Sequence, residues 1–240
     1  MKSRILFTAL LSIFIFQKGM AQSTSDFFDS ANTFYNTYIK DGLVDYKAIQ
    51  TNPDDLNNLL QLAKELNISK DDEKVYQAFW INAYNLQVIQ GIVAHYPVNS
   101  PLDINGFFDK TARAIGGKQI TLNDIENKLL RGNFPNEARF HFVLVCAGLG
   151  CPPIINTAYT PGNLEMLLQK QTEAALNNPS FIRVKGKRVQ LSQIFEWYKE
   201  DFIRDGKSEI DFVNQFRQSP LDTSAKVGYY TYDWTLNDIK

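Results

Sequence analysis

The longest periodic segment of the sequence, Val75–Tyr96, constrains the fold more than any other stretch. Apolar residues occur on almost every face that a helix over these residues would present. A helix of this kind is normally surrounded by protein, and Pro97 ends the segment because proline cannot continue a helix. The sequence therefore predicts a central, buried helix around which the other elements pack.

Two asparagines, Asn82 and Asn85, interrupt this apolar pattern, and their spacing of three places them on one face of the helix. Both amides need hydrogen-bond partners, because an unpaired buried one costs ~1–3 kcal/mol. They could tie the helix to nearby loop backbone. Alternatively, they could line a site and orient a catalytic histidine or a substrate carbonyl.

The remaining segments alternate between helical and extended patterns without a regular strand–helix–strand order. This irregular order predicts an α+β fold with packed helices and a largely antiparallel sheet. No repeat or linker divides the chain, so we expect one domain over residues 22–240. Helices are predicted over residues 25–39, 56–66, 163–176 and 192–202, hairpins around Gly116–Gly117 and Lys185–Lys187, and a terminal strand over residues 227–234.

The first 21 residues have the layout of a secretory signal. Lys2 and Arg4 precede an apolar run over residues 5–16, and Gly19–Ala21 supplies the small residues of a cleavage site. The apolar run is too short to span a membrane. We therefore expect cleavage after Ala21, a periplasmic or extracellular location, and no transmembrane segment in the mature chain.

Loss of this segment would change the net charge from −1 to −4, because it contains three basic residues and no acid. A mildly acidic chain offers no basic surface for nucleic acid or for anionic lipid. The sequence also implies no cofactor. The partners that remain are small ligands of the peptide or glycan kind, and the oligomeric state is left open.

Both cysteines and one of the two histidines lie in a single stretch, Arg139–Pro153. Its aromatic and β-branched run, Phe140–Val145, predicts a buried strand. Gly148 and Gly150 then end the strand. A cysteine presented at such a turn can be reactive, but a glycine turn is also a common way to end a strand.

The first functional hypothesis is a cysteine nucleophile with His141 as its base, because the thiolate is the form that attacks. Cys146 is an odd number of residues from His141, so the two would face opposite sides of a regular strand. The glycine turn could instead fold Cys151 back toward the sheet, which favours Cys151 slightly. Glu126, in a helix predicted to end near Arg131, or one of the two asparagines could orient the imidazole.

The same residues support non-catalytic alternatives. An exported protein could join Cys146 to Cys151 in a disulfide, which would exclude a free nucleophile unless the bond is labile. A zinc site that includes His141 is a weak match, because the four-residue gaps are unusual and no second histidine is near. The aromatic segment Tyr229–Trp234 could present a surface to a peptide or glycan, or it could simply pack in the core.

Five groups of motifs, distributed between residues 79 and 237, match one family. They are Phe79–Asn85, Gly116–Lys118 with Leu122–Glu126, His141–Phe142 through Cys151–Pro153, Ile194–Tyr198, and Tyr232–Asn237. Together they resemble the domain of unknown function 547 (DUF547), and the resemblance covers most of residues 25–238. It implies an exported or envelope protein with similarity to the papain and transglutaminase-like cysteine hydrolases. The family assigns no catalytic role to any residue.

Two functions are therefore predicted for an exported α+β domain. One is a cysteine-dependent hydrolase or transferase that acts on an amide or peptide-like bond. The other is a binding or scaffolding module of the cell envelope with a structural cysteine pair. The state of the two thiols distinguishes them, because a disulfide or two inert thiols favours the module.

Overall fold

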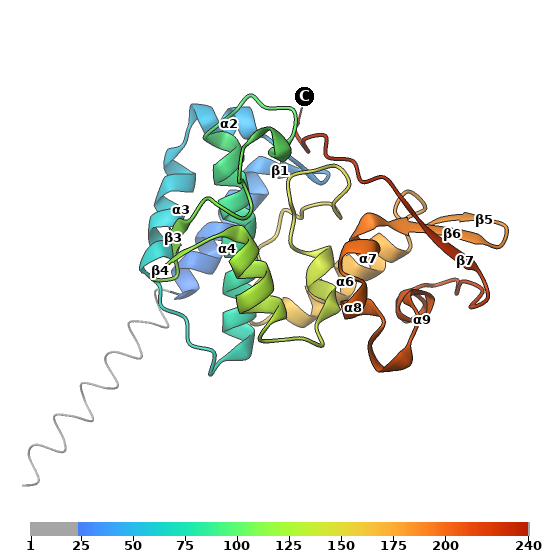
Figure 1. Ribbon diagram of the computed structural model, residues 1–240. Helices are drawn as coiled ribbons and strands as arrows, with labels where there is room; N and C mark the ends of the chain where they lie inside the picture. The colour runs from blue at the N-terminus through green and yellow to red at the C-terminus, as the bar shows by residue number, and fades with distance from the viewer. Residues whose placement is uncertain (1–23, 240) are drawn as a thin grey trace, which may run out of the picture.

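A computed structural model of the chain describes residues 24–239 (Figure 1). The predicted signal segment, residues 1–21, lies outside the described residues. Helices and short strands are mixed in one domain, as the α+β prediction requires. In the part of the chain that the structure describes, no helix is both long enough and apolar enough to cross a membrane.

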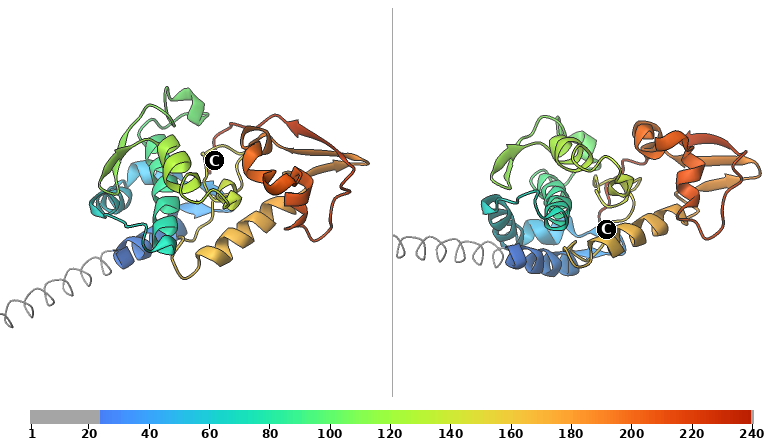
Figure 2. Two further views of the ribbon diagram at one scale, coloured as in Figure 1. Left: turned by 60° about the horizontal axis from the view of Figure 1, so that its bottom comes forward. Right: turned by 90° about the horizontal axis from the view of Figure 1, so that it is seen from below.

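Helix α4 (Glu73–Val93) confirms the predicted central helix. Asp72 caps its first turn by accepting a hydrogen bond from the backbone N–H of Val75. Every residue from 78 to 89 is buried, as expected for a helix that is apolar on nearly all faces. Figures 1 and 2 show α4 enclosed by the other helices and by the loops that follow it.

The first half of the chain forms the helical surroundings of α4. Residues 24–38 are helical, as predicted, and a short turn leads into the next two helices. Helix α6, from later in the chain, contacts α4 as well. The two helices of the first half are α2 (Tyr46–Thr51) and α3 (Asp54–Glu65), and the later helix α6 spans Leu164–Leu176.

Within residues 24–239 the strands form three separate small sheets in place of one larger sheet. Both predicted glycine hairpins are present, and strand pairs are antiparallel except for β6 with β7, which is parallel. The sheets are β1 (Ile39–Lys40) with β2 (Leu43–Val44), β3 (Arg113–Ile115) with β4 (Lys118–Ile120), and β5 (Arg183–Lys185) with β6 (Arg188–Ser192) and β7 (Lys226–Tyr230).

The predicted strand over Phe140–Val145 is wrong. Residues Ala138–Phe142 form a 3-10 helix, η3, and the chain then runs irregularly to Cys146. The run is buried, so its composition resembles that of a core strand, but no neighbouring strand pairs with it among the described residues. The side chain of Asn85 supplies hydrogen bonds in place of a strand: its amide donates to the Val143 carbonyl and accepts from the Val145 N–H, each at 2.9 Å.

Short helices position the remaining site residues. The helix predicted around Glu126 begins as α5 (Leu122–Asp124) and continues as η2 (Ile125–Arg131), a π-helix. The helix predicted over residues 192–202 is divided at Tyr198 into two helices. These two are α7 (Gln193–Trp197) and α8 (Lys199–Phe202), and the other short helices are η1 (Pro101–Asp103), η4 (Arg204–Gly206) and α9 (Glu209–Asn214).

The C-terminal segment crosses the molecule and holds the cysteine loop. The predicted strand is confirmed for β7, and the residues beyond it run back toward α2 (Figure 1). Backbone N–H groups of Leu149 and Gly150 donate to the carbonyls of Thr235 and Asp233 at 2.8 and 2.7 Å. The aromatic tail therefore contributes both to the last sheet and to the surroundings of the two cysteines.

Candidate functional site

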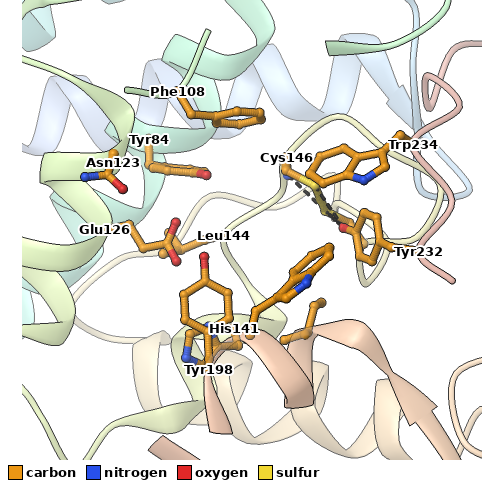
Figure 3. Close-up of a pocket in the computed structure, with 13 residues that line it drawn as sticks. Tyr84, Phe108, Asn123, Glu126, His141, Leu144, Cys146, Tyr198, Tyr232 and Trp234 are labelled. Atoms are coloured by element: carbon orange, nitrogen blue, oxygen red, sulfur yellow. Dashed lines mark hydrogen bonds between the residues drawn. A yellow bond between two sulfur atoms is a disulfide. The ribbon is translucent and has the colours of Figure 1, made fainter. Parts of the chain in front are cut away.

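A cavity of about 290 Å³ lies between α4, η2, the cysteine loop and α7 (Figure 3). We call it the aromatic cavity, because six aromatic rings form most of its wall. Four of the six site residues predicted from sequence line it, namely Glu126, His141, Cys146 and Cys151. The rings are those of Tyr84, Phe108, Trp197, Tyr198, Tyr232 and Trp234.

Both cysteines are joined in a disulfide, which was one of the alternatives open from the sequence. The glycine turn makes the loop between them compact. A Cβ atom at Gly150 would lie 2.8 Å from the backbone nitrogen of Asp233 and 2.9 Å from the Tyr232 ring, so no larger residue fits. The disulfide therefore lies on a loop whose shape the C-terminal segment fixes.

The hydroxyl of Tyr232 lies between the two sulfur atoms. It is 2.9 Å from Sγ of Cys146 and 2.8 Å from Sγ of Cys151 (Figure 3). Burial raises the pKa of Tyr232, so the hydroxyl keeps its proton and is a hydrogen-bond donor to sulfur. The sequence motif containing Tyr232 was recognised, but its contact with the sulfurs was not predicted.

His141 is buried at the other side of the aromatic cavity from the disulfide (Figure 3). Its Nε2 lies 2.8 Å from Oδ2 of Asp201, and its ring packs on the ring of Tyr198 with centroids 4.2 Å apart. The geometry therefore joins the imidazole to an aspartate, while the two sulfurs are joined to each other.

Asp201 is the acidic partner that the sequence did not reveal. Besides His141 it binds Nε of Arg131 at 2.6 Å and Nη2 of Arg204 at 3.2 Å. Burial alone would raise the pKa of Asp201, but the hydrogen bonds from His141 and Arg131 and the charge of Arg131 hold it well below its usual range. Asp201 is therefore ionised at neutral pH and fixes the orientation of the imidazole.

Glu126 projects from the π-helix into the opposite end of the aromatic cavity from the disulfide. Its carboxylate faces the hydroxyls of Tyr198 and Tyr84 (Figure 3). Burial is the main cause that raises the pKa of both tyrosines, and the charge of Glu126 raises it further. In this structure Asp201 holds His141, and Glu126 forms a polar end of the cavity together with tyrosine hydroxyls.

Asn82 and Asn85 do not line the aromatic cavity. Asn82 binds the backbone of Tyr159, donating to its carbonyl at 2.7 Å and accepting from its N–H at 3.1 Å. Asn85 binds the backbone before Cys146 in the same two-way manner. Both amides tie the central helix to loops, so their contribution to the site is the support of its backbone.

The geometry can support two kinds of chemistry. The tyrosine and glutamate end can donate and accept hydrogen bonds, and the aromatic walls can stack on a ring. Reduced cysteines would add a nucleophile to a cavity that already contains an oriented imidazole. Within residues 24–239, no group of three histidine, cysteine, aspartate or glutamate side chains is placed to hold a metal ion.

Comparison with known proteins locates the site within a family. The protein-family model described as "Protein of unknown function, DUF547" matches residues 67–176, a range that contains Glu126, His141 and both cysteines. Tyr198, Asp201 and Tyr232 lie beyond that range. No curated protein and no solved structure matches the chain, so the similarity to papain-like hydrolases stays a prediction. The family match agrees with the motifs, and residues 67–176 are similar to the DUF547 family of proteins of unknown function.

Proposed function

We propose that the aromatic cavity is the ligand-binding site of an exported module and that it takes a glycan-like ligand. One observation carries the proposal: aromatic rings and a single carboxylate converge on one cavity while both sulfurs are held in a disulfide. With neither cysteine free, the groups left to act on a ligand are those that stack and form hydrogen bonds.

The two tryptophans supply a stacking surface. The rings of Trp197 and Trp234 lie 5.9 Å apart, centroid to centroid, with planes inclined by 23°. The side chain of Trp197 is 46% exposed, which is unusual for so large an apolar group and places it where a ligand can reach it. A sugar ring presents an apolar face to such a surface and hydroxyl groups at its edge.

The other end of the aromatic cavity fits those hydroxyls. Glu126 accepts hydrogen bonds, and the hydroxyls of Tyr84 and Tyr198 and the amide of Asn123 both donate and accept them. The volume of about 290 Å³ is at the lower limit for small-molecule sites, which suits one ring of a larger ligand. An extended peptide would need more contacts with backbone or a longer groove.

Tryptophan fluorescence tests this proposal, because two of the three tryptophans line the cavity. We expect neutral oligosaccharides to change the emission of the mature protein in a saturable way. Glu126→Gln and Trp197→Ala should each weaken binding about tenfold or more, as expected for loss of a hydrogen bond or a stacked ring. Glu200→Gln, an exposed acid on α8, is the matched control and should bind as the native chain does.

Two outcomes would contradict the glycan assignment. One is the absence of saturable binding for a broad oligosaccharide panel. The other is preferential binding of short peptides to the native chain with the same dependence on Glu126 and Trp197, which would make the ligand a peptide.

A second function, a cysteine hydrolase active on amide bonds after reduction, is favoured by one specific observation. His141 is oriented by Asp201 and lines the same cavity as both cysteines. Because Nε2 bonds to Asp201, Nδ1 is the nitrogen that would take the thiol proton. The thiolate would attack the amide carbonyl, the C–N bond would break with the proton returned to the leaving nitrogen, and water would hydrolyse the thioester.

This second function requires a dithiol reductant and a movement of the loop, since the sulfurs and His141 lie on different sides of the cavity. Iodoacetamide labelling across pH, mapped by mass spectrometry with and without dithiothreitol, tests it. The expected result is labelling only after reduction, with a thiol pKa below the ~8.5 of free cysteine that reverts in His141→Ala. A reduced protein whose thiols have the free-cysteine pKa rejects the hydrolase.

A further inference from the structure

A second cavity, of about 600 Å³, lies further along α4 toward its C-terminal end, bordered by α3, by the chain around Phe107 and by β3. We call it the arginine cavity, because Arg113 lines it and is only 8% exposed. Its wall is otherwise rich in amides, which include Gln87 of α4. The residues of this cavity play no part in the function proposed for the aromatic cavity.

Arg113 has a buried charge without an acidic partner. Its Nη1 donates to the carbonyls of Phe107 and Thr111 at 3.2 and 2.9 Å. Within residues 24–239, no carboxylate forms an ion pair with it, and both of its hydrogen bonds to protein come from Nη1 and none from Nη2 or Nε. A buried cation is normally paired, and the two donors on the free edge of this guanidinium, which are not sealed off from solvent, can take an acceptor from the cavity.

Gln87 is a second polar side chain of the arginine cavity, and it has no hydrogen-bond partner among the described residues. Its side chain is 4% exposed and lines the arginine cavity, yet its amide makes no hydrogen bond with any residue that the structure describes. Buried amides are nearly always bonded, and an unpaired one is unfavourable. The Gln87 amide atoms are not among the polar atoms sealed off from solvent, so the amide faces the space of the cavity, where a ligand could reach it.

Glycine at position 91 brings these groups together. Gly91 is four residues after Gln87, so both lie on one face of α4. A Cβ atom at Gly91 would lie 3.0 Å from Nη2 of Arg113 and 2.5 Å from the Phe107 ring. The absence of a side chain therefore lets the guanidinium pack against the helix one turn from Gln87.

We propose that the arginine cavity binds a small ligand through a carboxylate held by the free edge of Arg113 and the amide of Gln87. The planar pair of donors on a guanidinium matches the two oxygens of a carboxylate. One buried cation balances one carboxylate charge, and the exposed Lys64 at the rim adds a second positive charge for ligands with a second acid group. The volume is within the range of small-ligand sites.

Nuclear magnetic resonance on the mature chain tests the proposal, with acetate, succinate, L-glutamate, inorganic phosphate and chloride as probes at equal ionic strength. The carboxylates should shift the Nε–Hε signal of Arg113 and the side-chain amide signal of Gln87 in a saturable way. Arg113→Lys and Gln87→Leu should each weaken that binding about tenfold or more. Gln87→Leu decides the matter if the arginine variant fails to fold, because Gln87 has no partner within the described chain.

Lysine variants supply the matched control. Lys64→Gln should weaken succinate binding, whereas Lys170→Gln, the same change at an exposed position on α6, should leave it unaltered. Three results would overturn the proposal: phosphate binding as tightly as the carboxylates, chloride producing the same shifts, or carboxylate binding that survives Gln87→Leu unchanged. None of the substituted residues lines the aromatic cavity. Because Arg113 interacts electrostatically with Tyr84 of that cavity, the Gln87 and Lys64 variants are the ones that test this site independently of the proposed glycan site.

Discussion

The aromatic cavity and the arginine cavity lie at successive positions along the same helix and differ in how their polar groups are satisfied. In the aromatic cavity Tyr232 binds the sulfurs, and His141 binds Asp201. In the arginine cavity Gln87 and the free edge of Arg113 have no partner among the described residues. The first site is organised by protein contacts, whereas the second has donors that no described residue satisfies.

The difference also concerns charge. Glu126 makes the polar end of the aromatic cavity negative, while Arg113 makes the other cavity positive. Phe107 and Phe108, adjacent in sequence, line one cavity each, with the Phe107 ring under the Arg113 guanidinium. A single loop therefore separates two sites that suit ligands of opposite character, and substitutions on α4 can test each site separately.

The largest effect is expected for Asn85→Leu, which breaks the support of the aromatic cavity. The substitution leaves the Val143 carbonyl and the Val145 N–H buried without partners. Each unsatisfied group costs ~1–3 kcal/mol, so we expect the free energy of unfolding to fall by about 4 kcal/mol. Urea denaturation measures this change. A loss below about 1 kcal/mol would show that the cysteine loop does not depend on the central helix.

Asp201→Asn should have the next largest effect, with a dependence on pH. The native carboxylate has a lowered pKa, so its stabilising contribution is present above the unfolded-state pKa of about 3.9 and is lost as pH falls. We expect the variant to be less stable by about 2 kcal/mol at pH 7, because it loses charged hydrogen bonds with Arg131 and His141. Urea denaturation of both chains at pH 7 and pH 3 should show the difference shrinking at low pH. An unchanged difference would contradict the ion-pair role.

These two residues show how far the sequence could predict the structure. Local patterns predicted the central helix and both glycine hairpins. The cysteine hypothesis also named Glu126, His141 and the two cysteines, which line one cavity, but it paired them differently from the structure. Local patterns could not predict Asp201, because its bond to His141 joins residues 60 positions apart that no periodicity relates. They also wrongly predicted a strand over Phe140–Val145. A segment buried against a helix and a strand buried in a sheet have the same apolar composition, so composition does not distinguish them.

Removal of the disulfide should have a moderate effect confined to the aromatic cavity. A cross-link that spans five positions restrains a small loop, and the chain-entropy relation gives about 2 kcal/mol for it. The Cys146→Ala and Cys151→Ala double variant should lose about this much stability by urea denaturation. Oligosaccharide binding should weaken while the Arg113 and Gln87 signals stay in place. Shifts of those two signals would show that the two cavities are coupled.

The smallest effect is expected for Gln87→Leu, the counterpart of Asn85→Leu two residues away on the same helix. Both native side chains are buried amides of α4, but only Asn85 has protein partners. Leucine at position 87 removes an amide that bonds to no described residue, so urea denaturation should give a stability within about 0.5 kcal/mol of the native value. A loss as large as that of Asn85→Leu would mean that Gln87 serves the fold. An unchanged stability combined with weaker carboxylate binding would mean that its amide is kept for a ligand.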